Sequence, residues 1–175
     1  MKPSTSNTEP PKIKIELTST DRFMEGLSAL ILLITWVMAI WFFGKLPDRI
    51  PSHFDDAGNI TNQSSKWVLF LLPMIATIIF ITLRILSRFP HVFNYPLKVT
   101  EKTAPHVYAF STKMVRSLNL GIVFFFSLAE LMIVISAQGV NPEFGILLIP
   151  LLLITTITFL IYSIRKLFIL GKQPA

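Results

Sequence analysis

The chain has 175 residues, of which 52% are hydrophobic and 15% are charged, whereas a soluble domain carries about 25% charged residues. This composition excludes a soluble globular domain. The formal net charge of +6 does not indicate a nucleic-acid partner, because membrane proteins collect Lys and Arg in cytoplasmic segments. The chain has no cysteine, which excludes disulfides, thiolate metal sites and cysteine nucleophiles.

Four apolar segments follow a polar beginning. Residues 1–22 are polar and contain three prolines, so we expect a disordered cytoplasmic tail. The apolar segments cover about residues 27–43, 67–83, 118–137 and 144–164, and each can cross a hydrocarbon core of about 30 Å as a helix. We therefore predict an all-α integral membrane protein, with a four-helix transmembrane domain over residues 23–170 and a short tail over residues 171–175.

The distribution of basic residues predicts the orientation in the membrane. The N-terminal stretch, the loop between the second and third segments with its flanks, and the C-terminal tail hold 13 of the 16 Lys and Arg residues. The opposite side has only Lys45, Arg49 and Lys66. The positive-inside rule then predicts cytoplasmic termini and an extracytoplasmic loop over residues 45–67.

The sequence before the third apolar segment predicts an early helix start. Thr103 precedes Ala104 and Pro105, a pattern typical of a capping residue followed by a first-turn proline. Apolar residues then recur at helical spacing, so we expect the third helix to begin near Ala104. Lys113 and Arg116 would lie at the level of the lipid headgroups.

The loop over residues 45–67 contains rigid and turn-forming residues. Two prolines bracket its start and Gly58 lies in an Asp- and Asn-rich turn, which predicts a structured cap that serves as a binding surface or a lid. His53, Phe54 and Asp55 lie between these elements. A structural His53 is the simpler interpretation, because the loop lacks the ligand spacing of a zinc site. The chain also lacks recognisable catalytic motifs, so we expect neither an enzyme nor a bound metal or cofactor.

Glu130 lies near the centre of the third apolar segment. An ionisable residue at this depth costs roughly 2.5 kcal/mol or more, faces the bundle interior as a rule and commonly serves function. One interpretation is a structural carboxyl group held by hydroxyl groups, for which the candidates are Ser127, Thr35, Thr155 and Thr156. The others are a ligand or proton site and a contact between two copies. We expect Glu130 and the outer loop to approach each other.

The outer loop "LPDRIPSHFDDAGNITNQSSK" resembles the signature of a bacterial membrane family of unknown function, whose domain also forms the N-terminal part of the SdpI-type immunity proteins. The pattern of that family is roughly L-P-x-x-I-P-x-H-F-x-x-x-G-x-x-D-x-W-G-S-K. The matching residues are Leu46, Pro47, Ile50, Pro51, His53, Phe54, Gly58, Ser65 and Lys66. Thr61, Gln63 and Ser64 stand where the family has Asp, Trp and Gly.

A second segment resembles a cytoplasmic motif of the same family, of the form N-Y-P-x-x-I-T-x-E-N. The matching residues are Asn94, Tyr95, Pro96 and Thr100. The resemblance implies a multi-pass protein of the bacterial plasma membrane, and it implies immunity or signalling more loosely.

These observations lead to two hypotheses of different classes. The first is a non-enzymatic membrane protein that binds an antimicrobial peptide, a toxin or a neighbouring membrane protein through its outer loop, with His53, Phe54, Asp55, Gly58 and Lys66 as candidate contacts. The second is a small transporter or lipid-handling protein in which Glu130 is the binding or coupling group.

Overall fold

The structure is a computed structural model that describes residues 10–55, 60–140 and 145–172. Four helices are long and apolar enough to cross a membrane, as the sequence predicts. The chain order is α1 (Ser19–Phe43), β1 (Arg49–Phe54), β2 (Ile60–Ser65), η1 (Lys66–Phe70), α2 (Leu71–Leu86), η2 (Pro90–Val92), α3 (Ala104–Ala137) and α4 (Gly145–Lys172). The parts of the predicted tails over residues 1–9 and 173–175 lie outside the described residues.

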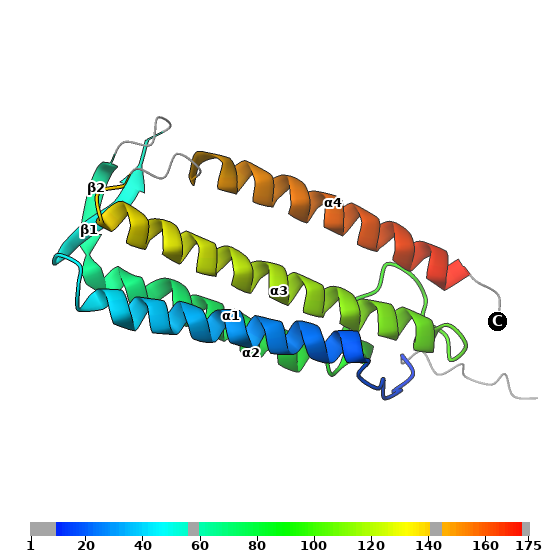
Figure 1. Cartoon of the computed structure of the whole chain (residues 1–175). Coiled ribbons are helices and arrows are strands. Elements are labelled where there is room, and N and C mark those ends of the chain that lie inside the picture. The colour runs from blue at the N-terminus through cyan, green and yellow to red at the C-terminus, as the bar shows by residue number, and fades with distance from the viewer. Residues whose placement is uncertain (1–9, 56–59, 141–144, 173–175) are drawn as a thin grey trace, which may run out of the picture.

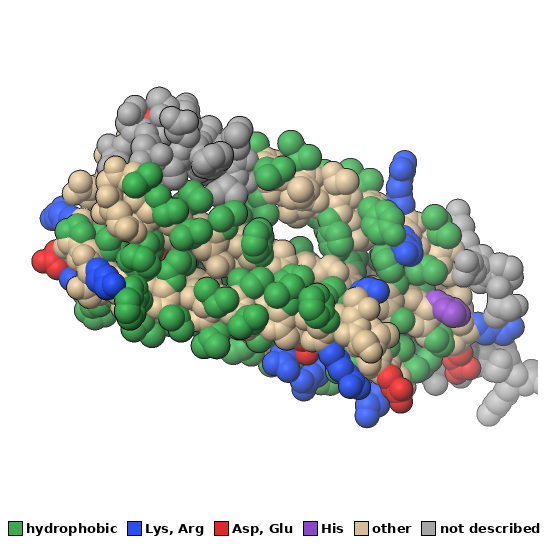
Figure 2. All heavy atoms as spheres, viewed as in Figure 1, with side chains coloured by type: hydrophobic (Ala, Val, Ile, Leu, Met, Phe, Trp, Pro, Cys, Tyr) green, Lys and Arg blue, Asp and Glu red, His purple; other side chains and the backbone are tan. Residues whose placement is uncertain are grey.

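The helices run side by side as one elongated bundle (Figure 1). Helices α1, α2 and α3 pack on one another, and α4 lies along α3. The β-strands lie at one end of the bundle, where α1 and α3 end, and we call this the hairpin end. We call the opposite end, where α1 and α3 begin, the basic end, because most of the Lys and Arg residues flank the helices there. Figure 2 shows hydrophobic side chains along the middle of the visible face and charged side chains toward both ends.

The chain is mostly helical, but the prediction of an all-α protein is wrong for the outer loop. Strands β1 and β2 pair antiparallel in a two-stranded sheet. The prolines that were expected to rigidify this loop fit such a hairpin, because Pro51 lies within β1 and proline is tolerated on edge strands. The predicted structured cap is therefore a β-hairpin.

Helix α1 begins at Ser19, inside the stretch predicted as a tail. Thr18 caps the helix: its hydroxyl oxygen accepts from the N–H of Asp21, and the carboxylate of Asp21 accepts from the N–H of Thr18. This reciprocal arrangement satisfies two N-terminal donors of the helix. Ile13 and Ile15, which precede the cap, pack against the bundle, so residues 10–18 form a strap across the basic end.

The helix bounds also extend the predicted segments. The third helix begins at Ala104, as its sequence predicts, with Pro105 in the first turn. The hydroxyl of Thr103 does not cap the helix as expected. It lies 3.1 Å from the hydroxyl of Thr100 and accepts from the Thr100 N–H, so the two threonines close a turn before α3.

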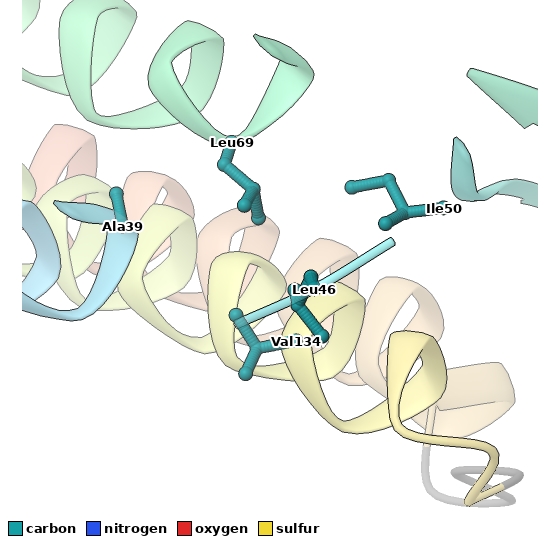
Figure 3. Packing of buried hydrophobic residues seen from close by; sticks show 5 residues of the cluster. All are labelled: Ala39, Leu46, Ile50, Leu69 and Val134. Carbon is teal, nitrogen blue, oxygen red and sulfur yellow. The ribbon is translucent and has the colours of Figure 1, made fainter. Parts of the chain in front are cut away.

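Three apolar clusters hold the bundle together. The outer cluster at the hairpin end contains Ala39, Leu46, Ile50, Leu69 and Val134 (Figure 3). The middle cluster contains Leu32, Ala76, Phe80 and Val123. The inner cluster at the basic end contains Ala104, Val107, Tyr108 and Leu167. The outer cluster joins α1, β1, η1 and α3, and the middle cluster joins α1, α2 and α3. The inner cluster attaches the C-terminal part of α4.

Candidate functional site

The hairpin is anchored to the helix ends by its first strand. Ile50 of β1 is fully buried and packs in the outer cluster with Leu46, Leu69 and Val134, and Figure 3 shows these side chains converging above α3. Strand β1 contacts α3 directly. Burying an Ile side chain contributes about 1.5–3 kcal/mol, so β1 is fixed on the bundle and determines where β2 lies.

The pairing of the strands determines which backbone groups of β2 are free. The N–H of Lys66 donates to the carbonyl of Asp48 over 3.0 Å, and the register then pairs Arg49 with Ser65 and Pro51 with Gln63. Hydrogen-bonded and non-hydrogen-bonded pairs alternate in an antiparallel ladder. The N–H groups of Gln63 and Ser65 therefore point away from β1, which also explains how β1 accommodates Pro51.

The outer edge of β2 is polar, and no third strand pairs with it within residues 10–55, 60–140 and 145–172. Thr61, Asn62, Gln63 and Ser65 are exposed. The Asn62 side-chain oxygen accepts from the N–H of Gln63 over 2.8 Å, which is a local bond that an incoming strand can replace. Strand edges of this kind accept further strands through main-chain hydrogen bonds.

The predicted contact residues of the outer loop occupy different positions in the hairpin. Lys66 is at its base, where Nζ lies 3.0 Å from the carboxylate of Asp48 and 5.0 Å from the ring centre of Phe43, so this residue holds the hairpin to α1. The backbone of His53 and Phe54 belongs to β1 at an irregularity of the register. Asp55 follows β1 and is exposed. Gly58 lies outside the described residues.

An aromatic group surrounds the base of the hairpin. The ring centres of Phe43 and Trp67 are 4.8 Å apart, and those of Phe43 and Phe70 are 5.0 Å apart. Lys45 Nζ lies 3.9 Å from the ring centre of Trp41. Aromatic and basic side chains in this combination are typical of a membrane–water interface.

Glu130 is fully buried on α3 between the outer and middle clusters. Val123 and Val134 flank it on the same helix, and Val134 packs toward Ile50 of the hairpin. Glu130 thus lies one helical turn from a residue that packs on the hairpin, and the expected approach of Glu130 and the outer loop stays a prediction.

The hydroxyl partners expected for Glu130 are also wrong. Both carboxylate oxygens are buried without a hydrogen-bond partner among the described residues. The Thr35 hydroxyl donates to the carbonyl of Ile31, and the Thr155 hydroxyl donates to carbonyls of its own helix. An unpartnered polar group of this kind is uncommon in a folded interior, which keeps Glu130 a candidate binding group.

A buried ion-pair cluster at the basic end was missed by the sequence reasoning. The guanidinium of Arg116 on α3 lies 2.9 Å from a carboxylate oxygen of Glu25 and 3.5 Å from one of Asp21, both on α1. The other oxygen of Glu25 lies 3.2 Å from Arg84 Nε on α2. Three helices are thus joined by charges. Two features of the sequence could have indicated this cluster: the Thr18–Asp21 capping pattern and the charged residues at the start of the first apolar helix.

The cytoplasmic motif predicted from the sequence packs against the same end. Tyr95 stacks on Tyr108 of α3 with ring centres 5.7 Å apart, and its hydroxyl donates to the carbonyl of Pro90 over 2.9 Å. Burial raises the pKa of Tyr95 to about 12. Asn94 and Pro96 are exposed. Tyr95 therefore attaches the loop between α2 and α3 to the bundle.

Four apolar helices, an aromatic group at one end and charged residues at both ends define a multi-pass membrane protein. Residues 30–77 match a family model described as "Domain of unknown function (DUF1648)". The match covers most of α1, the hairpin and the start of α2, and it supports the resemblance to a family of unknown function. No curated protein and no solved structure matches the chain significantly.

Proposed function

We propose that the protein is a non-enzymatic protein of the bacterial plasma membrane that binds a partner along the free edge of β2. Both termini are cytoplasmic and the hairpin is extracytoplasmic in this proposal, because 13 of the 16 Lys and Arg residues lie on the side of the termini. The partner is an extended segment of an antimicrobial peptide or toxin, or of a neighbouring membrane protein. The role is immunity or signalling, as the resemblance to SdpI-type immunity proteins implies.

The observation that supports this proposal is a short, anchored strand with an open polar edge. Ile50 fixes the hairpin on the helix ends, so the edge of β2 is presented at little further loss of conformational freedom. A segment that adds to this edge gains the outward N–H groups of Gln63 and Ser65 as donors. Exposed polar side chains on β2 limit unspecific strand addition.

A proline substitution tests the proposed strand addition. Gln63→Pro removes an outward N–H group and leaves the hydrogen bonds to β1 in place, because the Gln63 N–H points away from that strand. The matched control is Gln63→Thr, which keeps the N–H group and favours a strand. Each variant is expressed in a strain that lacks the gene, and survival is measured against a panel of antimicrobial peptides.

We expect the deletion strain to lose protection against at least one peptide of the panel. The wild type and Gln63→Thr restore survival, and Gln63→Pro does not. The immunity role fails if deletion leaves the sensitivity to every peptide unchanged, and strand addition to β2 fails if Gln63→Pro protects as well as the control. Equal amounts of all variants in the membrane are verified by immunoblotting.

A second candidate function rests on Glu130. Burying a polar group without a hydrogen-bond partner costs several kcal/mol, roughly the free energy of its transfer from water to an apolar medium. Because Glu130 destabilises the fold by this amount, its presence favours a function over a structural role. The function would be that of a small transporter or lipid-handling protein in which Glu130 binds or couples a substrate.

Two substitutions separate this function from a structural role. Glu130→Gln keeps the shape of the side chain, and Glu130→Leu removes its polarity. If Glu130 serves only the fold, Glu130→Leu stabilises the purified protein against thermal unfolding and both variants keep ligand-dependent stabilisation. If it serves transport, both variants lose pH-dependent activity or ligand-dependent stabilisation, while Gln63→Pro retains them. A silent Glu130→Gln variant removes the support for this function.

A further inference from the structure

A cavity of about 510 Å³ opens at the basic end of the bundle. Its walls come from the strap before α1, the first turns of α1, the end of α2 and the first half of α3. The charged lining residues are Lys14, Glu16, Arg22, Glu25, Arg88 and Arg116. The volume lies within the usual range of ligand pockets.

The acidic residues near this cavity are largely neutralised from within the protein. Glu25 is bonded through both oxygens, to Arg116 and to Arg84. Asp21 faces the guanidinium of Arg116 and closes the helix cap. Only Glu16, which is exposed on the strap, remains as an acidic lining residue without an ion pair among the described residues.

Three cations of the lining have no such internal partner. Lys14, Arg22 and Arg88 make no ion pair with any residue in the described part of the chain, and all three are exposed. They approach the cavity from the strap, from α1 and from the end of α2, so their charges converge on one space. The cavity therefore carries an excess of positive charge that an anion can balance.

The position of the cavity and the hydrogen-bond donors that line it indicate which anion it binds. The apolar part of α1 begins only a few residues after Arg22, and Arg88 closely follows the end of α2, so the cavity lies at the level of the lipid headgroups. Guanidinium groups bind phosphate through paired hydrogen bonds, and Lys adds a point charge. The hydroxyls of Ser87 and Thr112 donate to helix carbonyls, so the cations provide the donors.

From these observations we infer that the cavity binds a phosphate group, carried by an anionic phospholipid headgroup or by a soluble phosphate ester. Arg22 and Arg88 are the principal ligands, and Lys14 approaches from the strap. The strap is held by Ile13 and Ile15 on the inner cluster, so it bounds the cavity from the side of the N-terminus. This site is separate from the hairpin and does not depend on the function proposed for it.

The test uses the full chain in nanodiscs, which leave both membrane faces accessible. In one arm the lipid is phosphatidylcholine with an increasing fraction of phosphatidylglycerol. In the other arm it is phosphatidylcholine alone, with glycerol 3-phosphate or inorganic phosphate added to the buffer. The thermal unfolding midpoint reports binding, because a ligand of the folded state stabilises that state.

The pocket variant Arg22→Gln/Arg88→Gln is compared with Lys98→Gln/Lys102→Gln. The control removes the same charge from exposed residues of the same end that do not line the cavity. We expect the pocket variant to need at least about tenfold more of the effective probe, because it loses two charge-assisted contacts. The control keeps the wild-type response. Lys14→Gln, outside any helix, weakens the response as well and excludes a folding defect as the cause.

The arm that responds identifies the source of the phosphate. A response to phosphatidylglycerol indicates a lipid headgroup, and a response only to glycerol 3-phosphate or inorganic phosphate indicates a soluble phosphate. The inference is overturned if neither probe stabilises the wild type. It is equally overturned if the control loses as much as the pocket variant, because the effect would then be general surface electrostatics.

Discussion

Replacing Arg116 tests whether the buried charges at the basic end stabilise the bundle. Arg116 is 7% exposed, and its partners Asp21 and Glu25 are 8% and 13% exposed. Arg116→Gln leaves these two carboxylates without their shared cation. Removal of one partner from a buried ion pair costs about 3–5 kcal/mol. Glu25 retains Arg84 at 3.2 Å, so we expect a loss near the lower limit, about 3 kcal/mol.

The assay is chemical denaturation of the purified protein in detergent micelles, followed by circular dichroism. Arg165→Gln is the control, because Arg165 is exposed on α4 and a surface change of this kind stays within about 0.5 kcal/mol. The double variant Glu25→Gln/Arg116→Gln should lose at least about 1 kcal/mol less than the sum of the single variants, since coupled residues are not additive. An Arg116→Gln protein as stable as the control, or strict additivity, would refute the reasoning.

Two further predictions concern the hairpin and the loop before α3. Ile50→Ala should destabilise the hairpin end by about 2–5 kcal/mol and accelerate tryptic cleavage at the exposed Arg49. The control Gln63→Ala, at an exposed position, should do neither. Equal cleavage rates in the two variants would contradict the anchoring role of Ile50. The pKa of Tyr95 is raised from 10.0 to about 12 by burial, so between these values the folded protein retains a proton that the unfolded chain loses. The free energy of unfolding should therefore fall as the pH rises from 10 to 12, and Tyr95→Phe should show a smaller fall.

The length and hydropathy of the apolar segments predicted most of the fold in advance. Apolar runs long enough to cross a bilayer form helices, because a helix satisfies the hydrogen bonds of its own backbone groups in lipid. The start of α3 at Ala104 was predictable for a local reason, since Pro105 fits the first turn of a helix, where its missing N–H would have no helical partner.

The hairpin was less predictable, because its strands lack a strong pattern. β2 reads "ITNQSS" and has no apolar alternation, and β1 contains a proline. These strands form because Ile50 is buried on α3, which is a contact between distant parts of the chain. Strand propensity depends on such context, so the residues of the hairpin alone do not reveal it.

The partners of the charged residues were unpredictable for a related reason. Arg116 and Glu25 are 91 positions apart, and only the packing of α3 against α1 brings them together. Of the hydroxyls proposed for Glu130, those of Thr35 and Thr155 donate to carbonyls of their own helices instead, as hydroxyls in membrane helices commonly do. Sequence reasoning identified Glu130 as unusual but could not determine its surroundings.

Helix α3 runs along the bundle from the basic end to the hairpin end (Figure 1). Its 34 residues give a length of about 51 Å at a rise of 1.5 Å per residue, well beyond the hydrocarbon thickness. Near its C-terminal end Val134 packs with Ile50 of the hairpin, and in its N-terminal half Arg116 lines the cavity at the basic end. Tilting such a rod by about 10° displaces one end by roughly 9 Å relative to the other. One uninterrupted helix thus connects the hairpin end of the bundle with the basic end, so a displacement of α3 at one end requires a displacement at the other.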